Sequence, residues 1–397
     1  MGHGGRVLGR HGPFGAAHTR QCPARRAMIR LPRAVVVTGA SVGMGRATAV
    51  ATLGDRAAVA RGSAGLAGAA DEVRHAGGEG LILPVDVTDP KAIDRADQPV
   101  ADAFGRIDVW VNNAFAGVVA PFPQATPDEC RRVTEVTGLC CVFGTRAALS
   151  HMPLNNRGTN AQVGPALAYR GIPLPSAYCG AKHAIQGRNA SLRCELLHEG
   201  TRARTTMVQV PVVNTPQFAR VLSHVPGRAR PGTPVHEPDL AARSMDHAAA
   251  HPRRLAVWIG GSTVAPPVGN ALVPGLLNRY LAYGDDAQLD EGEHAGTGNL
   301  WSPADTPRGG DFWAPGPFDV ESRPGGAQGM DVPQPSMGRP GRLHRLWGSA
   351  LRTQDVPQRG RFQLGPSRGV WPLRAGARCL AAPGRGAESP HERPHRR

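Results

Sequence analysis

Short apolar runs rich in β-branched residues alternate with segments of helical periodicity between residues 34 and 270. This alternation is typical of βαβ units, whose strands run parallel and are covered by helices. We therefore predict an α/β fold with one doubly wound, parallel, seven-stranded sheet in a domain over 34–270. The predicted strands are 34–38, 56–60, 81–85, 107–111, 159–163, 205–210 and 255–259. The run 159–163, TNAQV, is unusually polar for a strand buried on both faces.

Both ends of the chain lack this pattern. Residues 1–33 are rich in Gly, His and Arg without apolar periodicity, and we expect a disordered, basic leader. One interpretation of the leader is a targeting peptide, although the Gly and Pro residues of the leader oppose the amphipathic helix that such a peptide needs. The other is translation from a start codon upstream of Met28, which stands just before the first predicted strand. We favour the second interpretation.

Beyond the domain, 271–300 carries one amphipathic segment, which predicts a helical extension. Its apolar positions are Leu272, Leu276, Leu277, Tyr280 and Leu281. Residues 301–397 are rich in Pro, Gly and Arg, with too few large apolar residues to offset the entropy of ordering, so we expect a disordered tail. Translational readthrough or a shifted reading frame would produce the same composition.

The formal net charge is +15, and it is carried by the two ends. Residues 1–33 carry +7 and residues 321–397 carry +9, which leaves −1 for the rest. A near-neutral middle has no electrostatic footprint for a polyanion, so nucleic-acid binding is expected, if at all, only through the tails. The longest apolar runs are shorter than 18 residues, so we expect no membrane span.

Seven cysteines are spread irregularly, without a CxxC pair. This arrangement suits neither a disulfide framework nor a zinc site. We predict free thiols, no metal and a reducing, cytoplasmic location.

A glycine-rich turn, TGASVGMG at 38–45, follows the first predicted strand and precedes a helical run. Glycines let the backbone turn tightly and approach a pyrophosphate, which the amides and dipole of the helix N-terminus stabilise. This turn is a candidate dinucleotide site.

Two further motifs carry candidate chemistry. Asn112 and Asn113 end a predicted buried strand, and Tyr178 and Lys182 lie one turn apart on a helix predicted from Ser176 to about His198. The chain has only two lysines against 44 arginines, and one of them stands at this position. An ammonium beside a phenol can lower the pKa of that phenol, a role in which arginine is not equivalent.

In this order, TGASVGMG, NNA and YCGAK resemble the three signatures of the short-chain dehydrogenase/reductase family, over roughly 34–270. The resemblance implies a Rossmann-like fold and an oxidoreductase that transfers hydride between a nicotinamide cofactor and a carbonyl or secondary alcohol. It implies that Tyr178 is the acid/base and that Lys182 lowers the tyrosine pKa and binds the nicotinamide ribose. The implied cofactor-binding residues are Thr38, Gly39, Ser41, Gly43, Met44, Gly45, Arg61, Asp86, Asn112, Ala114, Tyr178, Lys182, Pro211 and Thr215.

Cofactor choice depends on the residue after the second strand. An acid there would bind the ribose 2′-hydroxyl, whereas a basic residue would accommodate a 2′-phosphate. Arg61 occupies this position and favours NADP(H) over NAD(H). By the resemblance, Asp86 would contact adenine.

The sequence departs from the family pattern at three positions. Pro165 stands where the family has a catalytic serine, Thr137 where it has a helical asparagine, and Phe115 where NNA is followed by glycine. Loss of one donor at a developing oxyanion costs about 10²–10³ in rate. We therefore expect slow chemistry with cofactor binding retained; the alternative is a catalytically weak dinucleotide-binding sensor or interaction protein.

The expected partners are a small carbonyl or alcohol substrate and, by the resemblance, a second copy of the chain in a dimer or tetramer. Between 211 and 235, an apolar stripe at near-helical spacing predicts either a substrate lid or core packing. Its members are Phe218, Val221, Leu222 and Val225.

Overall fold

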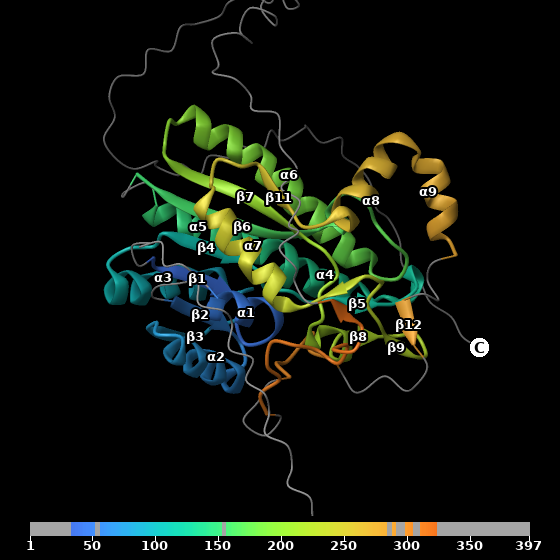
Figure 1. Ribbon diagram of the computed structural model, residues 1–397, viewed down its shortest axis with the longest axis horizontal. Helices are drawn as coiled ribbons and strands as arrows, with labels where there is room; N and C mark the ends of the chain where they lie inside the picture. Colours follow the sequence, from blue (N-terminus) through green and yellow to red (C-terminus); the bar gives the residue numbers. More distant parts are fainter. Residues whose placement is uncertain are drawn as a thin grey trace, which may run out of the picture. The chain divides into compact units, whose positions relative to one another are not determined.

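The computed structural model describes residues 33–51, 56–152, 156–283, 288–290, 298–304 and 310–323. Its centre is a seven-stranded parallel sheet in the order β11-β7-β6-β4-β1-β2-β3 (Figure 1). The strands are β1 Val35–Thr38, β2 Arg56–Ala60, β3 Gly80–Pro84, β4 Val109–Asn112, β6 Gly158–Pro165, β7 Ala203–Val210 and β11 Ala256–Trp258. Each overlaps one predicted strand, so the predicted sheet is confirmed.

Helices cover both faces of the sheet. On one face lie α1 Gly43–Ala51, α2 Ser63–His75 and α7 Pro238–Ala250. On the other lie α3 Pro90–Phe104, α4 Pro127–Val133, the π-helical turn η2 Thr134–Leu139, α5 Cys140–His151 and α6 Ser176–His198. Successive side chains of a strand point to opposite faces, and accordingly Val36 packs under the second group while Val35 and Val37 pack under the first.

The polar strand β6 is buried with the amide N–H groups of its side chains bonded inside the domain. Asn160 and Gln162 both donate to the Thr145 hydroxyl of α5, at 2.8 and 2.9 Å. Asn112 at the end of β4 joins the same cluster by donating to Asn160. Hydrogen-bonded amides cost far less to bury than unpaired ones, so this strand can lie at the centre of the sheet.

Strand order reverses between β1 and β4, since β1 continues through β2 to β3 on one side while β4 leads to β6 on the other. At such a switch point the loops after neighbouring strands separate and leave a crevice at the carboxyl ends. The glycine-rich turn follows β1 and the Asn pair closes β4, so both motifs meet at this crevice.

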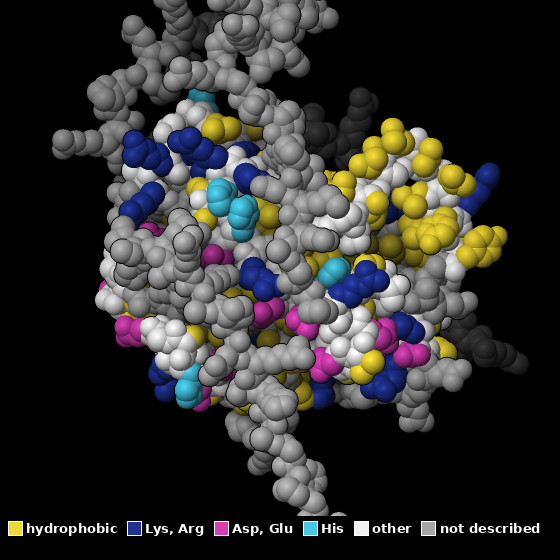
Figure 2. Space-filling view, in the orientation of Figure 1, with side chains coloured by type: hydrophobic (Ala, Val, Ile, Leu, Met, Phe, Trp, Pro, Cys, Tyr) yellow, Lys and Arg dark blue, Asp and Glu magenta, His cyan; other side chains and the backbone are white. Residues whose placement is uncertain are grey.

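After β11 the chain forms two helices, α8 Gly261–Leu272 and α9 Pro274–Leu281. The helical extension predicted to start at 271 thus starts at Gly261. Exposed apolar side chains gather over these helices, Leu272, Leu276 and Tyr280 among them (Figure 2). Every helix among the described residues is too short or too polar to cross a lipid bilayer.

Short pairings and 3-10 turns complete the described elements. The pairs are β5 Val118–Val119 with β8 Leu222–Ser223, β9 Arg228–Ala229 with β12 Leu289–Asp290, and β10 Val235–His236 with β13 Ser322–Arg323. The turns are η1 Phe122–Gln124, η3 Ala166–Ala168 and η4 Pro216–Ala219.

The tail expected to be disordered from residue 301 is in part packed against the domain. Residues 310–323, orange in Figure 1, pair through β13 and place Asp311 against Arg46 of α1. For this segment the prediction of disorder is wrong, because ion pairs and aromatic contacts compensate for the sparse apolar residues. The leader before residue 33, 305–309 and the tail after 323 lie outside the described residues.

Candidate active site

A cavity of about 920 Å³ lies at the carboxyl ends of the central strands. It brings together most of the residues singled out from the sequence. Those lining it are Gly39, Ser41, Gly43, Met44, Arg61, Ala114, Phe115, Pro165, Tyr178, Lys182, Pro211 and Thr215. Thr38, Gly45, Asp86, Asn112 and Thr137 are not among its lining residues.

The turn after β1 requires its glycines. Gly39 and Gly43 have φ of 68° and 60°, a left-handed conformation that disfavours other residues. At Gly45 an added Cβ would overlap the Gly39 carbonyl oxygen and lie 2.8 Å from the carbonyl carbon. The backbone of α1 therefore approaches the turn as closely as only glycine allows.

The end of β4 holds this turn in place. Thr38 Oγ1 accepts hydrogen bonds from the backbone N–H groups of Asn113 and Ala114, at 3.0 and 3.1 Å. Asn113 Nδ2 donates to the carbonyl oxygens of Thr38 and Gly39. Thr38 thus supports the site from behind, and Asn113, which also lines the cavity, is missing from the implied set of cofactor-binding residues although its motif was identified.

Asn112 and Asp86, both expected to face the cofactor, have protein partners instead. Asn112 is 1% exposed and accepts from Trp110 Nε1 at 3.0 Å within the buried amide cluster. Asp86 forms an ion pair with Arg132 at 2.8 Å. Burial acts to raise the pKa of Asp86, but hydrogen bonds from Arg132 and Thr88 outweigh it and lower the pKa.

Tyr178 and Lys182 lie together on α6 at the wall of the cavity. Lys182 is 3% exposed; its Nζ donates to the Val163 carbonyl at 2.9 Å and lies 5.6 Å from the centre of the Tyr178 ring. Phe115 packs edge-on against that ring at 5.1 Å.

Burial acts on the protonation of both members of this pair. Burial lowers the pKa of Lys182 and raises the pKa of Tyr178 well above its ordinary value. The Lys182 ammonium donates to the Val163 carbonyl, and its expected lowering of the Tyr178 pKa stays a prediction. In the structure as described, the phenol keeps its proton at neutral pH.

Two of the three departures from the family pattern, Pro165 and Thr137, occupy different surroundings. Pro165 lines the cavity at the end of β6 and has neither a hydroxyl nor an N–H to offer a reacting oxygen. Thr137 is fully buried in the π-helical turn, where its hydroxyl donates to the Ala116 carbonyl at 2.7 Å and accepts from the Ala116 N–H at 3.0 Å. Pro165 thus alters the site directly, and Thr137 ties η2 to the loop after β4.

Arg61, at the end of β2, directs its guanidinium toward the carbonyls of Asn299 and Trp301, at 2.8 and 3.0 Å. Thr215, 3% exposed, lines the cavity, and its Oγ1 has no hydrogen-bond partner in the part of the chain that the structure describes.

Apolar residues form part of the wall of the cavity that Tyr178 lines. They include Val118, Leu167, Ile172, Phe218 and Val221. Phe218 and Val221 belong to the stripe predicted between 211 and 235, whereas Leu222 and Val225 are not lining residues. The cavity therefore offers apolar surface to a bound molecule.

Comparison with known proteins identifies relatives of one kind. A family model described as short chain dehydrogenase matches residues 33–225. The uncharacterized oxidoreductase YxnA of Bacillus subtilis is 29% identical over 271 residues, 66% of this chain and 76% of that protein. An uncharacterized oxidoreductase of Methylorubrum extorquens is 30% identical over 168 residues, 41% of this chain and 67% of that protein.

Two solved structures share the fold. A short-chain dehydrogenase from Streptomyces avermitilis superposes with a TM-score of 0.54 at 24% identity, over 65% of this chain and 98% of that one. Levodione reductase gives a TM-score of 0.51 at 22% identity, over 59% and 99%.

Proposed function

Because the chain belongs to the short-chain dehydrogenase family of oxidoreductases, we propose that it is an NADP(H)-dependent reductase that transfers hydride from the nicotinamide to a carbonyl carbon. The observation that carries this proposal is the convergence of Tyr178, Lys182 and the glycine-rich turn on one cavity. A phenol able to donate a proton there lies in the same chamber as a turn built to approach a pyrophosphate.

The residues present fit a dinucleotide. Gly39, Gly43 and Gly45 keep side chains out of the turn, so that its amides can approach phosphate oxygens. Thr215 Oγ1, buried and without a partner among the described residues, is available to a carboxamide. The bound dinucleotide supplies the hydride; Thr215 and Pro211 would flank the nicotinamide and Lys182 its ribose.

Arg61 supports the choice of NADP(H) over NAD(H). It lines the cavity at the end of β2, where a guanidinium can pair with a 2′-phosphate through charge-assisted hydrogen bonds. The relevant test compares the two dinucleotides on one protein and then removes the guanidinium.

Tyr178 is the proton donor in this proposal. Its protonated phenol can deliver a proton to the oxygen of a carbonyl as hydride arrives at the carbon. Phe115 packs edge-on against the ring, and apolar residues line the same cavity. The site therefore favours an apolar ketone or aldehyde as substrate.

Pro165 favours a second candidate function, a dinucleotide-binding sensor with little turnover. In place of the family's serine it leaves the cavity that Tyr178 also lines without one hydroxyl, a donor that would stabilise the developing oxyanion. Cofactor affinity is common to both functions, and turnover distinguishes them.

The experiment is a calorimetric titration of the full chain with NADPH and NADH, followed by NADPH oxidation with apolar ketones. Binding of NADPH tighter than NADH, with measurable oxidation, supports the reductase. Binding without oxidation supports the sensor. If neither dinucleotide binds at millimolar concentration, both candidate functions are wrong.

A further inference from the structure

One segment of the C-terminal extension crosses the mouth of the dinucleotide site. Residues 310–323, hereafter the strap, return to the start of α1 after the domain is complete. The Gly43 N–H of the glycine-rich turn donates to the Trp313 carbonyl at 3.2 Å. An added Cβ on Gly316 would lie 2.5 Å from the Thr215 carbonyl carbon, and Phe312 lines the cavity. The strap therefore touches both the turn and the segment proposed to flank the nicotinamide.

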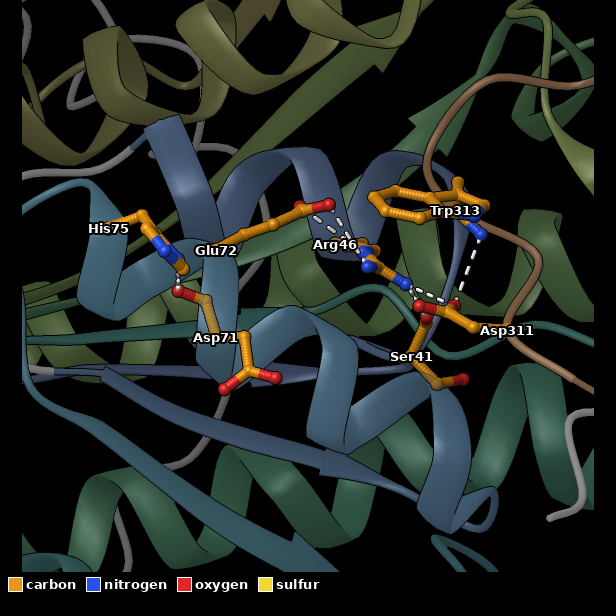
Figure 3. Close-up of polar contacts among 7 residues, drawn as sticks. All are labelled: Ser41, Arg46, Asp71, Glu72, His75, Asp311 and Trp313. Atoms are coloured by element: carbon orange, nitrogen blue, oxygen red, sulfur yellow. Dashed lines mark hydrogen bonds and ion pairs between the residues drawn. The ribbon is translucent and has the colours of Figure 1, made fainter.

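The strap is anchored to Arg46, the first charged residue after the glycine-rich turn (Figure 3). The Arg46 side chain is fully buried and pairs with Glu72 of α2 at 3.0 Å and with Asp311 of the strap. The Trp313 ring covers the guanidinium at 5.0 Å. Burial acts to lower the pKa of Arg46, but the two carboxylates outweigh it and raise the pKa.

A second anchor lies at the far end of the strap, against the segment after β7. Asn214 Nδ2 donates to Asp319 at 2.7 Å, and Asn214 Oδ1 accepts from the Phe318 N–H at 3.0 Å. Phe318 also packs edge-on against Phe218 at 5.9 Å. Two anchors thus hold the intervening backbone across the site.

The hydrogen-bond donors that contact the C-terminal extension are donors that a bound dinucleotide would also need. One amide N–H forms one good hydrogen bond, so the Gly43 N–H cannot serve a pyrophosphate oxygen while it serves the Trp313 carbonyl. A second part of the extension, 298–304, presents the two carbonyls to which Arg61 donates. Leu300 of that part is fully buried in the core, so it belongs to the domain, whereas every residue of the strap is half-buried or exposed.

From this geometry we infer that the strap is an autoinhibitory element, which competes with the dinucleotide for the glycine-rich turn and must leave before the cofactor binds. The inference rests on the proposed function, since it requires that the chain bind NADP(H). Weakening an anchor should then raise cofactor affinity, the opposite of what damage to a binding site would do.

The test uses two full-chain variants, one for each anchor. Asp311→Asn removes the charge paired with Arg46, and Asp319→Ala removes the acceptor for Asn214 without touching Arg46. Matched controls are Asp71→Asn and Asp128→Ala, which remove carboxylates from exposed ion pairs on α2 and α4. Thermal unfolding of each variant shows that it is folded.

We expect NADPH to bind each strap variant at least about tenfold more tightly than the parent chain, about 1.4 kcal/mol, and the controls to bind like the parent. In hydrogen exchange of the parent chain, saturating NADPH should speed exchange in 310–323 while it protects 38–45. Equal affinity in all variants, or weaker binding in both strap variants, overturns the inference. So does unchanged exchange in 310–323 when NADPH is bound.

Failure of the proposed function has a different signature. If no variant, the strap variants included, binds NADPH or NADH, the chain is not a dinucleotide-binding protein and the strap cannot regulate one. If the parent and all variants bind NADPH equally well, the proposed function stands and the strap is only a structural tether.

Discussion

Replacing Pro165 with serine tests whether the rest of the active site is intact. Pro165 has φ of −86° and ψ of 173°, an extended conformation that serine adopts without strain. Its side chain lines the cavity that Tyr178 also lines, so a hydroxyl at this position can reach the same bound molecule. The loss of proline costs at most about 1 kcal/mol of stability through the unfolded chain.

The magnitude follows from the missing hydrogen bond. One preorganised donor at a developing oxyanion contributes about 3–4 kcal/mol, or 10²–10³ in rate, and imperfect placement of a newly introduced serine reduces this. We therefore expect Pro165→Ser to raise the rate by at least about tenfold. The assay is single-turnover oxidation of NADPH with cyclohexanone and acetophenone, followed by absorbance.

Pro165→Ala is the matched control, because it removes the proline ring without adding a hydroxyl. A serine-to-alanine ratio well above one assigns the gain to the hydroxyl. If both variants bind NADPH and react at the same rate as the parent chain, the site is not a reductase that lacks one donor, and the sensor function is favoured.

Three further predictions concern the turn, the phenol and the cofactor. Gly45→Ala should destabilise the domain by about 1–3 kcal/mol in urea unfolding, since the new methyl group overlaps the Gly39 carbonyl. The control Gly187→Ala, on an open face of α6, should stabilise the domain by up to about 1 kcal/mol. Equal urea midpoints for the two variants would contradict the overlap. Tyr178→Phe should lower turnover by at least about 10²-fold, with NADPH affinity unchanged within a factor of about two. Because burial raises the tyrosine pKa, the rate of reduction by the parent chain should not fall between about pH 7 and 9. A decline of this rate through neutral pH would show that the phenol loses its proton there. In calorimetry, Arg61→Ala should weaken the binding of NADPH by about tenfold and leave the affinity for NADH unchanged. An equal loss of affinity for both dinucleotides would exclude contact with a 2′-phosphate.

Apolar patterning was sufficient to predict the sheet, including the polar run 159–163. That run is a strand because Asn160 and Gln162, two residues apart, face the same side and meet Thr145. The partner hydroxyl, that of Thr145, lies on α5. The pattern of residues along one strand cannot show which side chain of a helix 15 residues earlier will contact it. The position of the strand was therefore predictable, and the reason for its polarity was not.

The two asparagines after β4 illustrate how strand alternation assigns roles. Trp110 and Asn112 share a face because they are two residues apart, and the indole N–H of the first donates to the amide of the second inside the core. Asn113 follows the strand and is directed to the other side, where it holds the glycine-rich turn. Period-two reasoning applied to the strand end would have selected Asn113 for the site; the family motif alone did not separate the two.

The prediction of disorder was wrong for the strap because the composition was taken as an average over the whole tail. Three aromatic residues, Phe312, Trp313 and Phe318, stand within seven positions of the sequence and provide local contacts that the Pro- and Gly-rich average conceals. Their partners are two arginines and a phenylalanine of the domain, which no periodicity in the tail indicates. A cluster of aromatics in a weakly apolar segment is the signal that was present.

The burial of Arg46 explains how such a strap can be both specific and reversible. A guanidinium taken out of water costs several kcal/mol unless carboxylates surround it, so Asp311 and Glu72 are both needed while Trp313 covers it. When the strap leaves, the ring leaves with it, and Arg46 regains water while Glu72 remains as its partner. The charge is therefore never stranded in an apolar environment, and the free energy of closing stays small because the ion pair gained is offset by the hydration lost. If the strap were only a fixed structural tether, an apolar residue at position 46 would stabilise the domain more, because its burial carries no loss of hydration of a charge.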